Sequence, residues 1–202
     1  MEISEFLGRL ASGDPVPGGG GASALTGGIG AALCAMVAKL TAANRRYEAV
    51  RVDMEEILRR ADASVQKLTV LIQKDAQAFT PLAAAYRLPK DAPGREETLE
   101  SALLGASAVP LELMGELADI AGVLEILAEK GAKLALSDVG VAAAMLRAAL
   151  EGAALNVFIN TKLMKNRARA QAENERVQAL ISDVVPLCEG IYARVRESLA
   201  VI

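Results

Sequence analysis

The segment MEEILRRADASVQKLTVLIQKDAQAF, from Met54 to Phe79, decides the fold class of this chain. Its apolar residues recur in alternating steps of four and three, which is the spacing of a helix packed along its length. The series is Met54, Leu58, Ala61, Val65, Leu68, Ile72, Asp75 and Phe79. One member of it, Asp75, is a carboxylate. Pro81 is expected to bend or end this helix, and residues 86–94, with two prolines and a glycine, predict a loop.

The same spacing returns further along the chain. The segments are 99–127, kinked at Pro110; 141–163, after the capping residues Ser137 and Asp138; and 177–195, kinked near Pro186. A short helix over 3–10 and an alanine-rich helix from about residue 22 precede them. The chain is therefore expected to be all-α: a single domain over 1–202, formed by a bundle of about six helices, several of them long and kinked, with no sheet.

The composition excludes several classes of function. The 202 residues include no histidine, so no imidazole can act as a base or bind a metal, and no metal site is expected. A net charge of −3 and an aromatic content of 3% argue against nucleic acid as a partner. Cys34 and Cys188 are isolated within apolar patterns, and the acidic N-terminus lacks the basic start of a signal peptide. We expect a cytoplasmic protein with reduced, buried thiols.

A glycine-rich segment extends from Asp14 to Thr41, with the sequence DPVPGGGGASALTGGIGAALCAMVAKLT. It does not fit a dinucleotide loop, because no strand precedes it, or a phosphate loop of the Walker type, because no lysine follows the glycines. A membrane span over 22–40 is disfavoured, since Ala and Gly are poor substitutes for Leu and Ile in lipid. Free N–H groups at the start of this helix suit a carboxylate or phosphate of a ligand.

Three side chains stand out as candidates for a site. Burying the Asp75 carboxylate in an apolar seam costs free energy unless it binds a cation, a helix N-terminus or a ligand. A structural ion pair and a catalytic role both remain open for this residue. Asn156 and Asn160 lie one turn apart on a small, apolar helix face. Their amides could form hydrogen bonds with the donor and acceptor groups of a heterocyclic ligand, or hydrogen bonds between helices.

Five ordered blocks of sequence resemble the formiminotransferase-cyclodeaminase C-terminal family, which includes stand-alone methenyltetrahydrofolate cyclohydrolases. The blocks are FLGRLASGDPVPGGGGASAL (6–25), KLTAANRRY (39–47), KDAQAF (74–79), SDVGVAA (137–143) and NVFIN (156–160). The resemblance implies an all-helical, typically dimeric protein that acts on the one-carbon bridge between N5 and N10 of tetrahydrofolate. The folate would be the substrate, and no separate cofactor is expected.

The resemblance also implies roles for individual residues. Asp75 would be the catalytic acid and base, and the substrate-binding residues would be Gly18, Gly19, Gly20, Ser23, Lys74, Ser137, Asp138, Asn156 and Asn160. The reaction would be hydrolysis of 5,10-methenyltetrahydrofolate to the 10-formyl form, or closure of 5-formiminotetrahydrofolate with release of ammonia. The sequence does not choose between the two.

This chain departs from the family pattern at Gly21, Ala132 and Leu134, where polar residues are usual. These departures keep open a second hypothesis, a non-catalytic helical dimer that retains the fold. For either function a homodimer is expected, because small residues dominate 22–38 and 141–154 and such helices need neighbours on more than one side. No membrane partner is expected.

Overall fold

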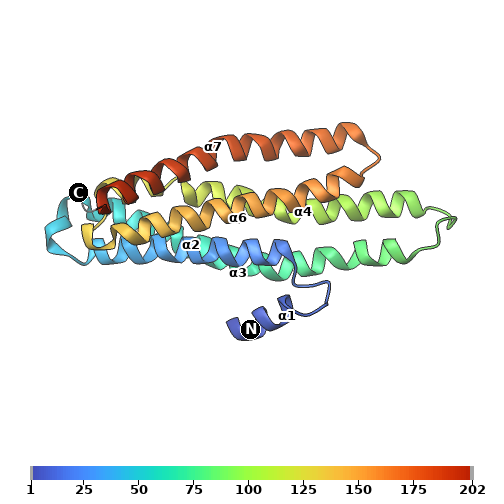
Figure 1. Ribbon diagram of the computed structural model, residues 1–202, viewed down its shortest axis with the longest axis horizontal. Coiled ribbons are helices and arrows are strands. Elements are labelled where there is room, and N and C mark those ends of the chain that lie inside the picture. Colours follow the sequence, from blue (N-terminus) through green and yellow to red (C-terminus); the bar gives the residue numbers. More distant parts are fainter. Residues whose placement is uncertain (1, 201–202) are drawn as a thin grey trace.

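The fold is a bundle of long α-helices, seen in a computed structural model that describes residues 2–200 (Figure 1). No strand occurs within those residues. The elements are α1 (Ile3–Leu10), α2 (Gly19–Ala42), the 3₁₀ helix η1 (Arg45–Val50), α3 (Arg51–Arg87), α4 (Arg95–Ala121), α5 (Leu124–Lys130), the 3₁₀ turn η2 (Lys133–Ala135), α6 (Leu136–Leu163) and α7 (Arg167–Leu199). The all-α prediction is confirmed.

Five long helices form the body of the bundle. Helix α2 packs against α3 and α6, α4 packs against α3 and α6, and α7 lies along α6. In the view of Figure 1, α7 runs along the upper edge and α1 lies below, while the hairpin of α3 and α4 extends well beyond the start of α2. Helices α2 and α6 are antiparallel, because Gly19 lies beside Asn156 and Gly30 beside Leu146. The start of α2 therefore meets the end of α6.

The core consists of aliphatic side chains and methionines, with small residues where two helices approach closely. The predicted seam of α3 is buried at Met54, Ala61 and Leu68. A Cβ atom at Gly27 would lie 2.4 Å from Leu117 Cδ2, so only glycine leaves room for that leucine. Close approach of neighbouring helices thus accounts for glycine in the middle of α2 despite its cost to the helix.

Several predicted boundaries differ from the observed ones. Helix α3 does not end at Pro81 but continues to Arg87. The single helix predicted over 99–127 is two helices, because the chain turns at Gly122 and Val123 between α4 and α5. Ser137 and Asp138 lie inside the first turn of α6, whose N-cap position is Ala135 and has no side-chain cap. Tertiary packing of the apolar face extends these helices beyond the local signals for their ends.

Two segments, α2 and Lys133–Leu163, are long and apolar enough to cross a membrane by length and composition. Of their most apolar windows, 56% and 44% of the residues are buried inside the bundle. Both segments therefore act as core helices of this fold, and each also leaves part of its apolar surface exposed.

Candidate active site

The start of α2 lies directly against the carboxylate of Asp75 on α3. A Cβ atom at Gly20 would lie 2.1 Å from Asp75 Oδ1 and 2.7 Å from Asp75 Oδ2, distances that real Cβ atoms do not show. A side chain at residue 20 would displace this carboxyl, so the absence of one lets the backbone reach the carboxylate. The helix begins at Gly19 with Gly18 as its N-cap, so its first unpaired N–H groups point to this region.

Around this contact the structure forms a cavity of about 360 Å³. Four elements supply its walls: the lead-in to α2 with the first residues of that helix, the second half of α3, the last turns of α6, and α4 through Ala106. Its lining residues are Pro15, Val16, Gly18, Gly19, Gly20, Asp75, Ala78, Phe79, Leu82, Tyr86, Ala106, Asn156, Ile159, Asn160 and Leu163. The volume is within the range of sites that hold a small organic ligand.

The two asparagines of α6 face this cavity with part of their hydrogen-bonding capacity unused. Asn156 Nδ2 donates to the Gly152 carbonyl at 2.8 Å, and Asn160 Nδ2 donates to the Asn156 carbonyl at 2.8 Å. These bonds lie within α6, so the hydrogen bonds between helices that the sequence left open are not observed for these amides. Each amide keeps its oxygen and its second N–H for another partner.

Asp75 is the residue of this cavity whose pKa is shifted from its ordinary value. Burial raises the pKa of its carboxyl, and a hydrogen bond from the Gly21 backbone N–H opposes that rise. No lysine or arginine lines the cavity, and no ion pair to Asp75 occurs within residues 2–200. The structural ion pair that the sequence left open is therefore absent from the described chain. A carboxyl with a raised pKa and no fixed cation is suited to exchange protons with a ligand.

Other predicted site residues lie elsewhere. Ser23 is buried one turn into α2, where its hydroxyl donates to the Gly19 carbonyl at 2.8 Å. Lys74 points away from Asp75 and pairs with Glu112 Oε1 on α4 at 2.9 Å. Ser137 and Asp138 are at the opposite end of α6, about 28 Å from Asn156 at the rise of an α-helix. The chain by itself does not bring these four residues into the cavity.

The positions that depart from the family pattern are also divided between the two ends of the bundle. Gly21 adjoins the cavity, with Asp75 Oδ2 at 3.9 Å from the place of a Cβ atom. Ala132 is buried at the far end, where its N–H donates to Thr41 Oγ1 at 2.8 Å. Leu134, next to it in η2, is 98% exposed.

Sequence reasoning missed the aromatic and aliphatic wall of the cavity. Asp75, Phe79, Leu82 and Tyr86 continue the steps of four and three along α3, and the last three line the cavity with Asp75. The prediction stopped at Pro81, which the helix passes through. Extending the spacing across that proline would have identified Leu82 and Tyr86.

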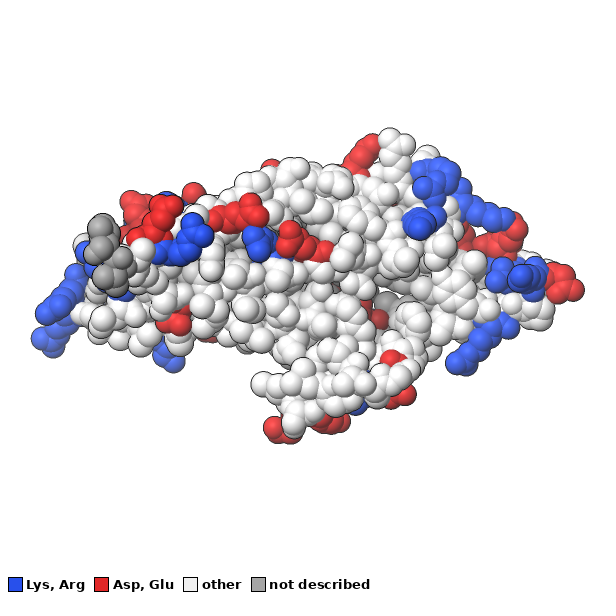
Figure 2. Space-filling view, in the orientation of Figure 1, with Lys and Arg blue, Asp and Glu red and all other residues white. Residues whose placement is uncertain are grey.

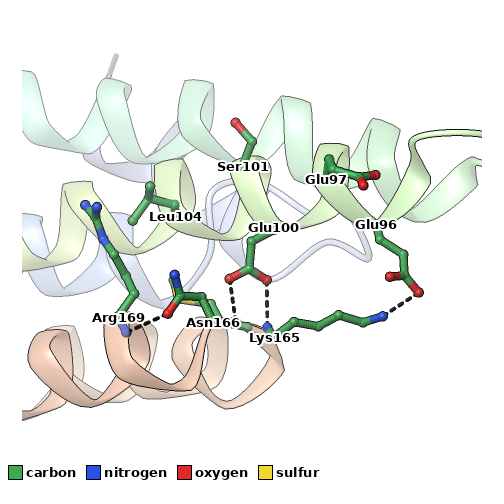
Figure 3. A pocket seen from close by; sticks show the side chains of 9 residues that line it. Glu96, Glu97, Glu100, Ser101, Leu104, Lys165, Asn166 and Arg169 are labelled. Atoms are coloured by element: carbon green, nitrogen blue, oxygen red, sulfur yellow. Dashed lines mark hydrogen bonds and ion pairs between the residues drawn. The ribbon is translucent and has the colours of Figure 1, made fainter.

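A second hollow, of about 560 Å³, lies between the start of α4 and the connection from α6 to α7 (Figure 3). Several of its polar groups already bind one another. The Glu100 carboxylate accepts the backbone N–H groups of Lys165 at 2.7 Å and Asn166 at 3.0 Å, and the Lys165 amine pairs with Glu96. These contacts hold the α6–α7 connection against α4, so we assign this hollow a structural role.

Neither cysteine contributes to the site. Burial raises the pKa of the Cys34 thiol to about 12 and that of the Cys188 thiol to about 11. Both residues are buried and free, as predicted. The thiols stay protonated at neutral pH and are not nucleophiles.

Comparison with known proteins agrees with this geometry. A family model described as formiminotransferase-cyclodeaminase matches residues 2–179. The methenyltetrahydrofolate cyclohydrolase of Methylorubrum extorquens is 37% identical over 98% of this chain and 97% of its own length. The formimidoyltransferase-cyclodeaminase of Rattus norvegicus is 31% identical over 90% of this chain, which covers 34% of that longer protein.

A solved structure has the same architecture over almost the whole chain. The crystal structure of formiminotetrahydrofolate cyclodeaminase from Thermotoga maritima superposes with a TM-score of 0.82 at 34% identity. The match covers 98% of this chain and 96% of that one. A relative named as a cyclohydrolase and a solved structure named as a cyclodeaminase each correspond to this chain over nearly the whole of their own length.

Proposed function

Because this chain belongs to the formiminotransferase-cyclodeaminase family, we propose that it is an enzyme acting on the one-carbon bridge between N5 and N10 of tetrahydrofolate. The observation that carries the proposal is Asp75, a carboxyl with a raised pKa and no cation beside it, in a cavity of about 360 Å³. In both candidate reactions a nucleophile that adds to the carbon between two nitrogens loses a proton, and a nitrogen that leaves this carbon gains one, so a single group that accepts and then donates a proton can serve both.

The first candidate is hydrolysis of 5,10-methenyltetrahydrofolate. Water attacks the electrophilic carbon between N5 and N10, and the Asp75 carboxylate accepts a proton from that water. The bond between the carbon and N5 then breaks and N5 takes a proton from Asp75. The added oxygen loses its second proton to solvent, so the carbon remains on N10 as a formyl group. The net reaction consumes one water and releases one proton.

The second candidate is closure of 5-formiminotetrahydrofolate. N10 attacks the formimino carbon and loses its proton, and the formimino nitrogen gains protons and leaves as ammonia. Asp75 can serve both transfers, because N10 and the departing nitrogen are bonded to the same carbon in the intermediate. The matches to relatives named for each activity support both candidates, and we place the cyclohydrolase first because the full-length relative of that name is 37% identical, against 34% for the cyclodeaminase of known structure.

The remaining cavity residues bind and orient the folate in this proposal. Asn156 and Asn160 offer amide groups that can pair with the donor and acceptor edge of the pterin. Phe79 and Tyr86 provide aromatic faces for a flat ring. The N–H groups at Gly19 and Gly20 stabilise negative charge at the start of α2.

Absorbance assays with each purified substrate test the proposal. Loss of the methenyl absorbance identifies the cyclohydrolase, and its appearance from the 5-formimino substrate identifies the cyclodeaminase. If neither substrate is turned over, the proposal that the protein is an enzyme is contradicted, and the non-catalytic helical dimer is favoured. Calorimetry with 5-formyltetrahydrofolate then decides whether the folate site is retained, because a protein without the site shows no saturable binding.

We also propose that the protein is a cytoplasmic homodimer. Support comes from the apolar surface that α2 and α6 leave exposed, including Leu155 at 68% and Ile159 at 57%. Covering such a patch with a second copy buries apolar area that a monomer leaves in water. Light scattering should give twice the chain mass of 21.1 kDa, whereas a mass of one chain over a wide concentration range, or sedimentation with membranes after lysis, would refute the proposal.

A further inference from the structure

Helix α1 is held against the bundle by one side chain and by its connection to α2. Phe6 is the buried residue of α1 and is 3% exposed, while Ile3 and Leu7 are 67% and 53% exposed. Within residues 2–200, no hydrogen bond or ion pair joins α1 to another helix. Figure 2 shows α1 as a lobe below the body of the bundle, with a mostly uncharged surface where the two meet. The position of α1 therefore depends on the packing of Phe6.

Phe6 packs at the point where the start of α2 meets the Asp75 carboxyl. The place of a Cβ atom at Gly21 lies 3.9 Å from Phe6 Cε2 and 3.9 Å from Asp75 Oδ2. Pro17 Cβ lies 3.5 Å from the same point. Phe6 is not among the residues that line the cavity. Its ring is thus close to the carboxyl but does not touch a ligand bound in the cavity.

The Gly21 N–H, which lies at this point, has no partner inside its own helix. Gly21 is the third residue of α2, and the first backbone bond of that helix runs from the Ala22 N–H to the Gly18 carbonyl. The Gly21 N–H instead donates to the Asp75 carboxyl. A carboxyl of α3 therefore caps α2, and the orientation of this carboxyl in the cavity depends on the place of Gly21.

A crevice of about 370 Å³ between α1 and α3 brings water close to this bond. Its α3 residues lie on the helix face next to the one that carries Asp75 and the cavity lining. Removal of the Phe6 ring would open a path from the crevice to the Gly21 N–H. The lining residues are Glu5, Arg9, Pro17, Ile72, Gln73 and Ala76.

We infer that Phe6 is a positioning residue, whose ring holds the Gly21 N–H against the Asp75 carboxyl and keeps water from that bond. The inference rests on the proposed function, in which Asp75 accepts and donates the proton. A hydrogen bond from an amide to a carboxylate is stronger in an apolar surrounding than in water, where water competes for both groups. Phe6 thus fixes the direction in which Asp75 faces the ligand.

The charged groups around Asp75 do not take this role. Glu5 and Arg9 of α1 line the crevice and not the cavity, and Lys74 of α3 pairs with Glu112. The first turn of α2 carries no acidic residue, and the last turns of α6 face the cavity with uncharged amides. An apolar ring is therefore the group of α1 that acts on the carboxyl.

Hydrogen exchange of the Gly21 amide tests the contact without reference to activity. The amide should be protected in wild type, and Phe6→Ala should speed its exchange at least about tenfold, because the bond to Asp75 then opens more often. Phe6→Leu keeps an apolar side chain and should stay close to wild type. Leu7→Ala is the matched control, because it shortens an exposed apolar side chain of the same helix. Equal exchange in wild type and Phe6→Ala would overturn the inference.

Thermal unfolding separates this role from support of the core. Phe6 belongs to neither of the two buried clusters of the bundle, so Phe6→Ala should fold with a Tm close to that of wild type. Global unfolding of this variant would overturn the inference, because Phe6 would then stabilise the whole fold and not one bond. Phe6→Leu still reports on the contact in that case.

Kinetics of the same variants test the role in the reaction. Phe6→Ala should lower kcat at least about tenfold and change KM less than about threefold, because the ring orients Asp75 and does not touch the ligand. Burial is the larger cause of the raised pKa of Asp75, so added water should move the acid limb of the pH profile to lower pH, although a weaker Gly21 bond opposes this.

Two results distinguish the possible failures. A lower kcat with an unmoved acid limb, or equal losses in Phe6→Ala and Leu7→Ala, would overturn the positioning role. If wild type turns over neither substrate, the proposed function fails, and the exchange rate of the Gly21 amide still decides whether Phe6 protects the bond to Asp75.

Discussion

Replacing Gly20 by alanine tests the contact on which the candidate active site is built. The added Cβ atom would lie 2.1 Å from Asp75 Oδ1 and 2.5 Å from Asp75 Cγ. Ordinary van der Waals contact begins at 3.4 Å, so the carboxyl must move by more than 1 Å or α2 must separate from α3. Asp75 has a short side chain, so it cannot avoid the new methyl group without leaving its position in the cavity.

The expected effects on rate and stability differ in size. A displacement of about 1 Å of a reacting group costs about 100-fold in rate, so kcat/KM should fall by about that factor. Overpacking costs about 1 to 3 kcal/mol, while alanine in a helix is favoured over glycine by up to about 1 kcal/mol. The net loss of stability is therefore between about 0 and 3 kcal/mol, and each kcal/mol corresponds to a Tm lower by about 2 to 4 °C in a chain of this size.

Gly21→Ala is the matched control. Its Cβ atom would lie 3.5 Å from Pro17 Cβ and 3.9 Å from Asp75 Oδ2, both ordinary contacts, and its backbone N–H is retained. This variant should keep its activity and be as stable as wild type or slightly more stable. Kinetics and thermal unfolding of both variants, together with Gly20→Ala combined with Asp75→Ala, check the mechanism. Equal behaviour of Gly20→Ala and Gly21→Ala, or no recovery of Tm in the double variant, would refute the proposed contact.

Three further outcomes are expected. Asp75→Asn should lower turnover by about 100-fold or more while Tm is kept or raised, because no cation is left unpaired; undiminished turnover would remove Asp75 from the mechanism. In wild type, kcat/KM should fall as pH falls through the raised pKa of Asp75. Stability relative to Asp75→Asn should decline as pH rises from 3.8, the ordinary pKa of an aspartate, through the raised pKa, because burial disfavours the charged form; parallel profiles would contradict this. Gly27→Ala should destabilise by about 1 to 3 kcal/mol, since its Cβ would lie 2.4 Å from Leu117 Cδ2, whereas Gly28→Ala, with its nearest neighbour at 3.9 Å, should not; denaturant midpoints compare them.

Some parts of the candidate site could be identified from local sequence. Asp75 is conspicuous because it interrupts an apolar series, and Asn156 and Asn160 because they share one helix face. The structure brings all three to one cavity with the glycines. The position of Lys74 could not be predicted in the same way. Its side chain pairs with Glu112 on α4, and nothing in the sequence around Lys74 indicates that partner.

The sequence by itself determined the helices and which face of each is buried, because hydrophobic periodicity acts within a few turns and needs no knowledge of distant neighbours. Where the helices end was decided by tertiary packing, which carried α3 through Pro81 and started α6 before Ser137. The site itself depends on contacts between residues far apart in the chain. Only the assembled bundle places the Gly20 backbone against the Asp75 carboxyl, raises the pKa of that carboxyl by burial, and separates Ser137 and Asp138 from the cavity by most of the length of α6.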